Sequence, residues 1–331
     1  MPIAELHPGY ENRHIFYGAD APDNVRESLA YLLPLPDQGL GVIVYTWVHA
    51  AGADGMGRAG AMAVVYGRGV PETVSDAADG IAVPDAMDFD DWRVGPIHLQ
   101  MSGTTTSSVV FRGQRISIDY RFEGINPSFA FLPNPGGCPS WLADDRTEQG
   151  GRVAGTLTVD GRAYSYDTFG HRDHSWGVRD WGGPTHWKWW NVMAPDVSIH
   201  FMELQAFGRT SVHGYVHRDG VTALITGHDA DFDLDAELMH TDVRVTFTDE
   251  AGRTTRVRTW RGADLHWPVS PRLTLHEAAM HAEVEGAPAV AYIEMAWPPE
   301  YLDHHAGTGP GVGALTVDRG AAAGSASAAA S

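Results

Sequence analysis

A long series of strand-like runs separated by turn residues restricts the fold of this chain more than any other feature. In the first half, β-branched and aromatic residues concentrate at residues 40–50, 60–67, 107–111, 114–122, 152–159 and 162–168. In the second half they concentrate at residues 185–194, 197–207, 211–217, 221–227, 242–248, 254–260 and 289–297. Strands that recur about every 8–12 residues, with turns between them, predict an all-β protein made of antiparallel barrels or sandwiches.

Both halves carry a similar series of hairpins, so we predict two antiparallel β-barrel domains in tandem rather than one large sheet. Gly-Gly-Pro at residues 182–184 interrupts the chain, which gives domains at residues 1–183 and 184–319. The Ala/Gly/Ser-rich residues 320–331 have low complexity and are expected to form a disordered tail.

Few other elements are expected between the strands. Short helices are expected at residues 24–33 and 273–282. Residues 132–151, which include Pro-Asn-Pro-Gly-Gly-Cys-Pro, are expected to form a long loop over the mouth of a barrel.

The charge balance excludes several kinds of partner. The chain has 23 basic and 42 acidic residues and a formal charge of −19, which repels nucleic acid and anionic membrane surfaces. No apolar run approaches the roughly 18 residues of a membrane helix. The one cysteine, Cys138, cannot form an internal disulfide and the first residues do not resemble a signal peptide, so we expect a cytoplasmic location. The expected partners are hydrophobic small molecules or other protein chains, an oligomer included.

Residues 170–183 combine two histidines, two aspartates, two arginines and two tryptophans between glycines. Tryptophan beside charged groups is typical of a polar network packed into an apolar wall, and the glycines suggest bends. The segment is therefore interpreted either as the polar centre of a site or as a buried structural link between two domains. On a strand, Asp173 shares a face with His171, whereas His174 lies on the opposite face and meets Asp173 only if the segment bends. An Asp–His pair can provide a general acid near neutral pH.

Glu203 is a second candidate acid. It lies in a strand-like run whose two faces are both largely apolar, so desolvation is expected to raise its pKa and keep it protonated. A buried ion pair with Arg172 or Arg179 is the competing structural interpretation. Aromatic residues nearby can line an apolar pocket and stabilise a developing carbocation, or can simply form core; they include Trp187, Trp189, Trp190, Phe201 and Tyr215.

Motifs for cofactors are weak. A metal site could use His171 with Asp173 or His174 and one of the later histidines, His186, His200, His213 and His217. Paired cysteines, a His-Glu-x-x-His motif, a serine-hydrolase elbow and a glycine-rich phosphate loop are all missing from the sequence. We therefore expect neither a metal nor an organic cofactor.

Asp173-His174-Ser175-Trp176-Gly177, followed by Arg179-Asp180-Trp181, resembles the Asp-His-x-Trp-Gly signature of carotenoid 1,2-hydratase (hydroxyneurosporene synthase) and its AttH-like relatives. The resemblance extends over roughly residues 10–318 and is strongest to an uncharacterised bacterial branch. It implies two lipocalin-like β-barrels. It also implies that a His-x-Trp pair, here His174 and Trp176, protonates an isoprenoid double bond together with a downstream Tyr-x-Asp pair. Phe201 and Glu203 stand at those two downstream positions, so the acid is kept and the tyrosine hydroxyl is lost.

These observations together predict a cofactor-independent enzyme acting on an isoprenoid- or polyketide-like molecule at the domain junction. The reaction would be acid-initiated hydration, cyclisation or isomerisation, because the resembled family spans several chemistries and fold does not fix reaction. Glu203 or the Asp173–His174 pair would supply the proton. The pocket would be formed by Trp176, Trp187, Trp190, Phe201 and Tyr215, and the residues that hold residues 170–183 rigid would be Arg172, Arg179, Asp180 and Trp181. The alternatives are a non-catalytic carrier of an apolar ligand and a metal-dependent lyase.

Overall fold

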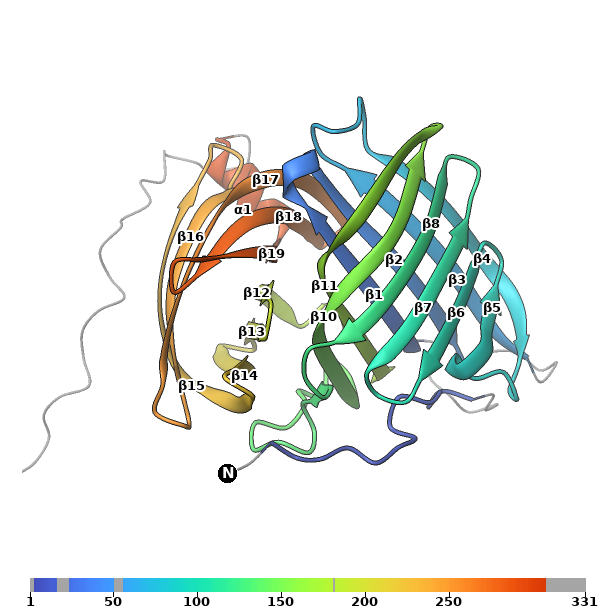
Figure 1. Ribbon diagram of the computed structural model, residues 1–331, viewed down its shortest axis with the longest axis horizontal. Helices are drawn as coiled ribbons and strands as arrows, with labels where there is room; N and C mark the ends of the chain where they lie inside the picture. Colours follow the sequence, from blue (N-terminus) through green and yellow to red (C-terminus); the bar gives the residue numbers. More distant parts are fainter. Residues whose placement is uncertain (1–2, 17–23, 51–55, 181, 308–331) are drawn as a thin grey trace, which may run out of the picture.

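The protein consists of two antiparallel β-barrels packed against each other (Figure 1). The computed structural model describes residues 3–16, 24–50, 56–180 and 182–307. Within these ranges the only α-helix is α1 (Pro299–His305). The predicted all-β fold with two antiparallel barrels is therefore confirmed.

The first barrel is an eleven-stranded sheet that is nearly closed. Its strands are β1 (Val25–Leu35), β2 (Leu40–His49), β3 (Met56–Tyr66), β4 (Val74–Pro84), β5 (Trp92–Val94), β6 (Ile97–Ser102), β7 (Thr106–Arg112), β8 (Ile116–Gly124), β9 (Phe129–Ala130), β10 (Asp145–Val159) and β11 (Arg162–Val178). The hydrogen-bonded order is β4-β3-β2-β1-β11-β10-β8-β7-β6-β5, with β9 paired to β10. The barrel is left open between β4 and β5, which end this path.

The second barrel is closed and follows the chain order, so that each strand pairs with its neighbours in sequence and the last pairs with the first. Its strands are β12 (Pro184–Ala194), β13 (Val197–Ala206), β14 (Arg209–Arg218), β15 (Val221–Leu234), β16 (His240–Asp249), β17 (Thr254–Ser270), β18 (Leu273–Val284) and β19 (Ala287–Trp297). In Figure 1 it lies to the left of the first barrel, in yellow to red.

The prediction of two short helices is wrong, because the segments at residues 24–33 and 273–282 belong to the strands β1 and β18. Both strands are buried on nearly all positions, and they contact each other across the barrel junction. A strand covered on both faces loses the alternation of apolar and polar residues, so periodicity cannot separate it from a helix. Cross-strand pairing then decides the conformation.

The segment at residues 170–183 also differs from expectation. Its first nine residues continue β11 as regular strand to Val178 and do not bend. The loop expected at residues 132–151 is shorter than predicted and ends at residue 144, because β10 begins at Asp145. The sheet changes between Val178 and Pro184, which is where the predicted domain boundary falls; two independently folding domains remain a prediction. The predicted tail at residues 320–331 lies outside the described residues. In the described part of the chain, no helix has the length and apolarity of a membrane-spanning segment.

Alternation along the strands divides most of the buried apolar side chains into three large clusters, and a fourth, small cluster lies around Trp176. Leu29 and Leu33 of β1 point into the first barrel with its core, whereas Leu32 points outward toward the second barrel. The second barrel has its own core, around Trp190 and Phe201. The outward-facing residues of both barrels meet at the junction, so the junction is itself a packed core.

Gly150 of β10 lies at a close approach of the two barrels. A Cβ at this position would lie 2.4 Å from Ser198 Oγ and 3.0 Å from Met193 Cγ, both in the second barrel. We expect Gly150→Ala to push the barrels apart and to lower the free energy of unfolding by about 1–3 kcal/mol, the usual cost of overpacking. Urea denaturation measures this. Gly227→Ala is the control, because a Cβ there meets no atom nearer than 4.0 Å; equal losses in the two variants would contradict a tight junction.

Candidate functional site

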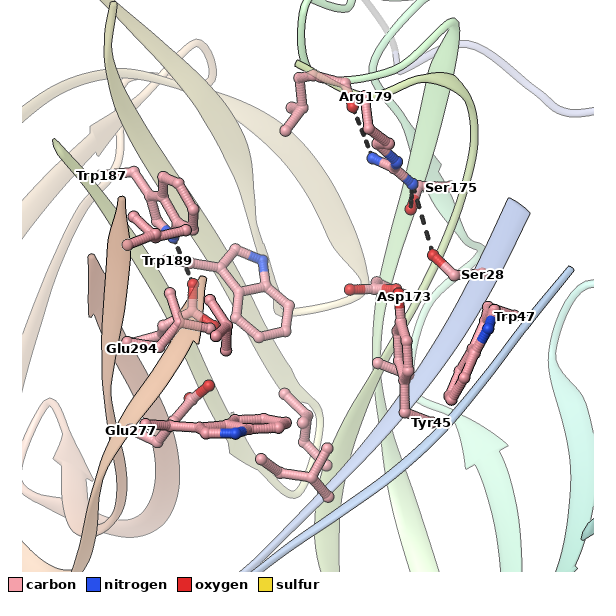
Figure 2. A pocket seen from close by; sticks show the side chains of 18 of the residues that line it. Ser28, Tyr45, Trp47, Asp173, Ser175, Arg179, Trp187, Trp189, Glu277 and Glu294 are labelled. Atoms are coloured by element: carbon pink, nitrogen blue, oxygen red, sulfur yellow. Dashed lines mark hydrogen bonds between the residues drawn. The ribbon is translucent and has the colours of Figure 1, made fainter. Parts of the chain in front are cut away.

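A cavity of about 510 Å³ lies between the two barrels. Strands β1, β2 and β11 of the first barrel form one wall, and β12, β17, β18 and β19 of the second form the other (Figure 2). The other lining residues are mainly apolar or aromatic, and the polar ones are Arg26, Ser28, Arg146, Asp173, Ser175, Arg179, Ser270, Glu277 and Glu294. This size and composition are those of a site for a drug-sized, mainly apolar molecule.

Two carboxyl groups share the wall formed by the second barrel. Glu277 of β18 and Glu294 of β19 are paired across the ladder, and both are buried. Burial and the nearby negative charge of Glu294 raise the pKa of Glu277 well above its ordinary value, and burial also raises the pKa of Glu294. The Trp187 indole N–H donates to Glu294. Two carboxyls this close cannot both ionise easily, so burial and their mutual repulsion favour a pair that keeps one proton.

Arginine side chains line the opposite wall. Arg146 of β10 donates to Asp173 of β11 at 2.6 Å. Burial raises the pKa of Asp173, while Arg146 opposes this shift. Arg179 donates to the Leu142 carbonyl at 2.6 Å and to Ser175. Figure 2 shows Asp173 and Arg179 on the side of the space opposite Glu277 and Glu294.

Aromatic side chains complete the cavity. Trp187 and Trp189 come from β12, Tyr45 and Trp47 from β2, and Trp267 from β17. Alternate residues of β12 face the cavity, because successive side chains of a strand point to opposite faces. Of the aromatic residues predicted to form the pocket, Trp187 lines it. Trp190 and Phe201 instead pack inside the second barrel.

The charged residues of β11 are divided between two environments. Asp173 and Ser175 face the cavity, whereas Arg172 and His174 are turned away from it and are fully buried. The expected Asp173–His174 pair therefore does not form. His174 instead contacts two other carboxylates, with Nδ1 3.0 Å from Glu11 and Nε2 2.7 Å from Glu27.

The environment of His174 fixes its charge. Burial alone would lower the pKa of His174, but the hydrogen bonds with Glu11 and Glu27 outweigh burial and raise the pKa to about 9. Arg172 donates to the same Glu11 at 2.9 Å. These four residues form a closed network of two cations and two anions, which ties the N-terminal segment to β1 and β11.

The remaining predicted residues lie outside the cavity. The Trp176 ring stacks on the His14 ring at 3.8 Å, against the N-terminal segment. The Tyr215 hydroxyl is buried 2.8 Å from Ser198 Oγ. Asp180 accepts from the Gly182 backbone N–H at 3.0 Å. Trp181 lies outside the described residues.

Glu203 is not a protonated acid, and the expected rise of its pKa is wrong. It lies on β13 on a different face from the cavity, forms an ion pair with Lys188 and lies 3.4 Å from His228 Nε2. The hydrogen bond from His228 is the main cause that lowers the pKa of Glu203 to about 2, and Lys188 adds to it. The apolar run around Glu203 could not show these two partners, because other positions of the chain contribute them.

Sequence reasoning missed the two carboxyls of the cavity, Glu277 and Glu294. The signal was present, since each is an isolated acid in an apolar run: Glu277 precedes Ala-Ala-Met, and Glu294 lies between Ile and Met. This is the pattern that selected Glu203. A helix at residues 273–282, as expected from the sequence, would hide the pairing of Glu277 with Glu294 on the neighbouring strand.

One group of residues has the composition of a metal site. Among the described residues, Glu148, His171 and His200 are buried with ligand atoms within 4.8 Å of one another. Glu148 is already occupied: His171 Nε2 lies 2.7 Å from it, the Trp189 indole N–H donates to it at 3.0 Å, and Arg146 forms an ion pair with it. A divalent cation would lie beside the guanidinium of Arg146, which opposes binding.

We therefore expect the purified protein to be insensitive to chelation. Treatment with EDTA should leave Tm unchanged in a thermal unfolding scan, and elemental analysis should find no stoichiometric transition metal. A clear fall of Tm that added Zn²⁺ reverses would instead establish a metal at Glu148, His171 and His200.

The raised pKa of His174 makes a measurable contribution to stability. The protonated ring is favoured in the folded state, so its stabilisation is complete below the unfolded pKa of about 6.5 and is lost as pH rises through about 9. His174→Gln should remove this part of the pH dependence, whose slope is at most about 1.4 kcal/mol per pH unit. Urea denaturation across this range measures it. The same slope in wild type and variant would show that His174 is neutral.

The two-barrel fold is similar to that of several solved structures. The structure is similar to an AttH protein from Nitrosomonas europaea, with a TM-score of 0.60 and 12% identity over 89% of this chain and 96% of that one. It is also similar to CghA, with a TM-score of 0.55 and 14% identity over 89% and 93%. Kievitone hydratase from Nectria haematococca gives a TM-score of 0.51 and 11% identity over 85% and 92%. At these identities the similarity shows a shared fold.

A search of the curated proteins by sequence finds no match. One family model matches residues 8–299, which include both barrels and every residue of the cavity. The chain belongs to the family described as a domain of unknown function, DUF7064.

Proposed function

We propose that the protein is a cofactor-independent enzyme that carries out acid-initiated hydration, cyclisation or isomerisation of a hydrophobic small molecule, of isoprenoid or polyketide type, in the cavity between the barrels. The observation that carries the proposal is the Glu277–Glu294 pair, a proton-holding group on the wall of an aromatic cavity. A carboxylic acid kept neutral by its surroundings is the usual proton donor in such chemistry. Similarity to kievitone hydratase, a hydratase by name, and to CghA, solved with Sch210972, supports this reaction class.

The chemistry uses both walls. Glu277 donates its proton to a double bond or carbonyl oxygen of the substrate, and the positive charge that develops on the substrate stabilises the two carboxylates that are left, with the Trp187 N–H holding Glu294 in place. The rings of Trp187 and Trp189 stabilise positive charge that develops on the substrate. Asp173, positioned by Arg146 at 2.6 Å, takes up a proton from an attacking water or from a carbon next to the cation. One proton enters the substrate and one leaves it, so no redox partner is needed.

This assignment changes the roles of the residues that resemble the hydratase signature. His174 and Trp176 do not line the cavity; they act through β11, whose position sets the place of Asp173. Arg172 has the same supporting role through Glu11. The proposed proton donor therefore lies on β18 instead of at the position of Glu203 on β13.

Glu277→Gln tests the assignment. The amide keeps the shape but holds no transferable proton, so turnover should fall about 100-fold or more. A panel of isoprenoid and polyketide-like alkenes is incubated with the protein in ¹⁸O-labelled water, and products are followed by mass spectrometry. Glu203→Gln is the matched control, with unchanged turnover, because Glu203 lies outside the cavity. Recovery of every compound chemically unchanged would identify a carrier and reject the enzyme.

The same pair makes a prediction that needs no substrate. An acid whose folded pKa is raised binds its proton more tightly in the folded state, so the folded protein loses stability as pH rises above the unfolded pKa of about 4.3. Glu277→Gln removes this loss, and its Tm should exceed that of the wild type at about pH 8 by more than at about pH 5. A Tm difference that does not change with pH would show that Glu277 is ionised.

A further inference from the structure

Two tyrosines adjoin the carboxyl pair of the cavity without lining the cavity themselves. Tyr292 of β19 points to the same side of its sheet as Glu294, because successive side chains of a strand alternate between the two faces. Its cross-strand partner on β18 is Ala279, two positions from Glu277. Tyr292 and Glu277 are therefore diagonal neighbours, which lie within reach of an aromatic side chain. Tyr292 and Tyr66 are both fully buried in the core of the barrel junction.

Tyr66 is contributed by the other barrel. It lies on β3 opposite Gly41 of β2, and its ring covers that glycine closely: a Cβ there would lie 2.1 Å from the Tyr66 Cζ and 2.4 Å from its hydroxyl oxygen. The ring is therefore packed against the backbone of β2. Its hydroxyl interacts with that of Tyr292, which in turn interacts with Glu277. The three groups form a row from the first barrel to the cavity wall.

The polar atoms of this row are buried without well-aligned hydrogen bonds. Within the described ranges of the chain, this holds for the hydroxyls of Tyr66 and Tyr292 and for Oε2 of Glu277. A buried hydroxyl without a partner is costly and rare, and phenylalanine would fill the same space without that cost. Burial raises the pKa of both phenols well above the ordinary value, so both remain donors at neutral pH.

Such donors are needed once Glu277 ionises. Loss of its proton leaves two buried carboxylates side by side, Glu277 and Glu294. Burial and the charge of Glu294 raise the pKa of Glu277, and Tyr292 opposes them because it favours the ionised form. The other charged groups that act on this set from the packed strands are Arg146, Asp173 and Asp264.

We propose that Tyr292 and Tyr66 are positioning residues for the acid, whose hydroxyls form a chain of hydrogen bonds to Glu277 once its proton has passed to the substrate. Tyr292 donates to Oε2 of Glu277, Tyr66 donates to Tyr292, and each phenol keeps its own proton. A hydrogen bond to a charged acceptor is stronger than one to a neutral acceptor, so the chain stabilises the state after proton transfer more than the state before it. Only interactions of this kind accelerate a chemical step. This role rests on the proposed function, since it concerns the ionised form of Glu277.

Infrared spectroscopy tests the chain without a substrate. Protonated carboxyl groups absorb apart from carboxylates, and the band of the pair is identified by its loss in Glu277→Gln. Tyr292→Phe keeps the ring but removes the donor, so the pH midpoint of this band should rise by about one unit or more, the effect of one hydrogen bond to a charged group. Tyr66→Phe should raise the midpoint by less, because its hydroxyl acts through Tyr292.

Tyr31→Phe is the matched control. Tyr31 is also a buried tyrosine whose hydroxyl has no well-aligned hydrogen bond within the described residues, but it lies in the core of the first barrel. Its replacement should leave the midpoint unchanged. An unchanged midpoint in Tyr292→Phe, or an equal rise in Tyr31→Phe, would overturn the proposal. Should Tyr292→Phe fail to fold, Tyr66→Phe decides by the same measurement.

Kinetics separate this inference from the proposed function. On a compound that the protein converts, Tyr292→Phe should lower kcat about tenfold or more and leave KM within about twofold, because Tyr292 lies outside the cavity. The basic limb of the pH profile should move upward together with the infrared midpoint. A raised midpoint in a protein that converts no compound would uphold the hydrogen-bond chain and reject the enzyme. Turnover that requires Glu277 but is unchanged in Tyr292→Phe, with an unchanged midpoint, would do the reverse.

Discussion

Strand β11 carries charged side chains on both faces, and both faces are buried. Every one of these charges must meet an opposite charge or a hydrogen-bond partner, because an isolated ion in a protein interior costs several kcal/mol. Inside the first barrel, Arg172 and His174 are compensated by Glu11 and Glu27. Toward the second barrel, His171 is bonded to Glu148 and Asp173 to Arg146. The position of the strand, and with it one wall of the cavity, depends on these pairs being complete.

The same rule separates the carboxylates that can react from those that cannot. Glu11, Glu148 and Glu203 each form an ion pair with at least one cation, Arg172, Arg146 and Lys188 respectively, and their pKa values are lowered. Glu277 and Glu294 have each other and an indole N–H instead, so burial wins and the pair keeps a proton. Four of the five are buried and Glu203 is half-buried. The number of cations within contact, rather than burial itself, decides which of them is an acid.

The cavity exists because two convex sheet surfaces meet imperfectly. Close contact at Gly150 limits the distance between the barrels at that point, and the large rings of Trp187 and Trp189 line the space that remains. The result is an apolar space with arginines on one wall and a protonated carboxyl pair on the other (Figure 2). This polarity gives a bound molecule one orientation, which is the basis for assigning the roles of Asp173 and Glu277.

The sequence by itself determined the fold class and the pair of barrels, because turn residues and strand-like runs are local signals that repeat along the chain. It also identified residues 170–183 as a polar network and placed Asp173 and His174 on opposite faces of a strand. Tertiary structure alone decided which carboxyl holds a proton. Glu203 and Glu277 look alike in sequence. In the structure Lys188 and His228 lie against Glu203, whereas Glu294 lies beside Glu277. Strand register across a sheet sets those neighbours, and charges brought together over long separations leave no local pattern from which a pKa can be predicted.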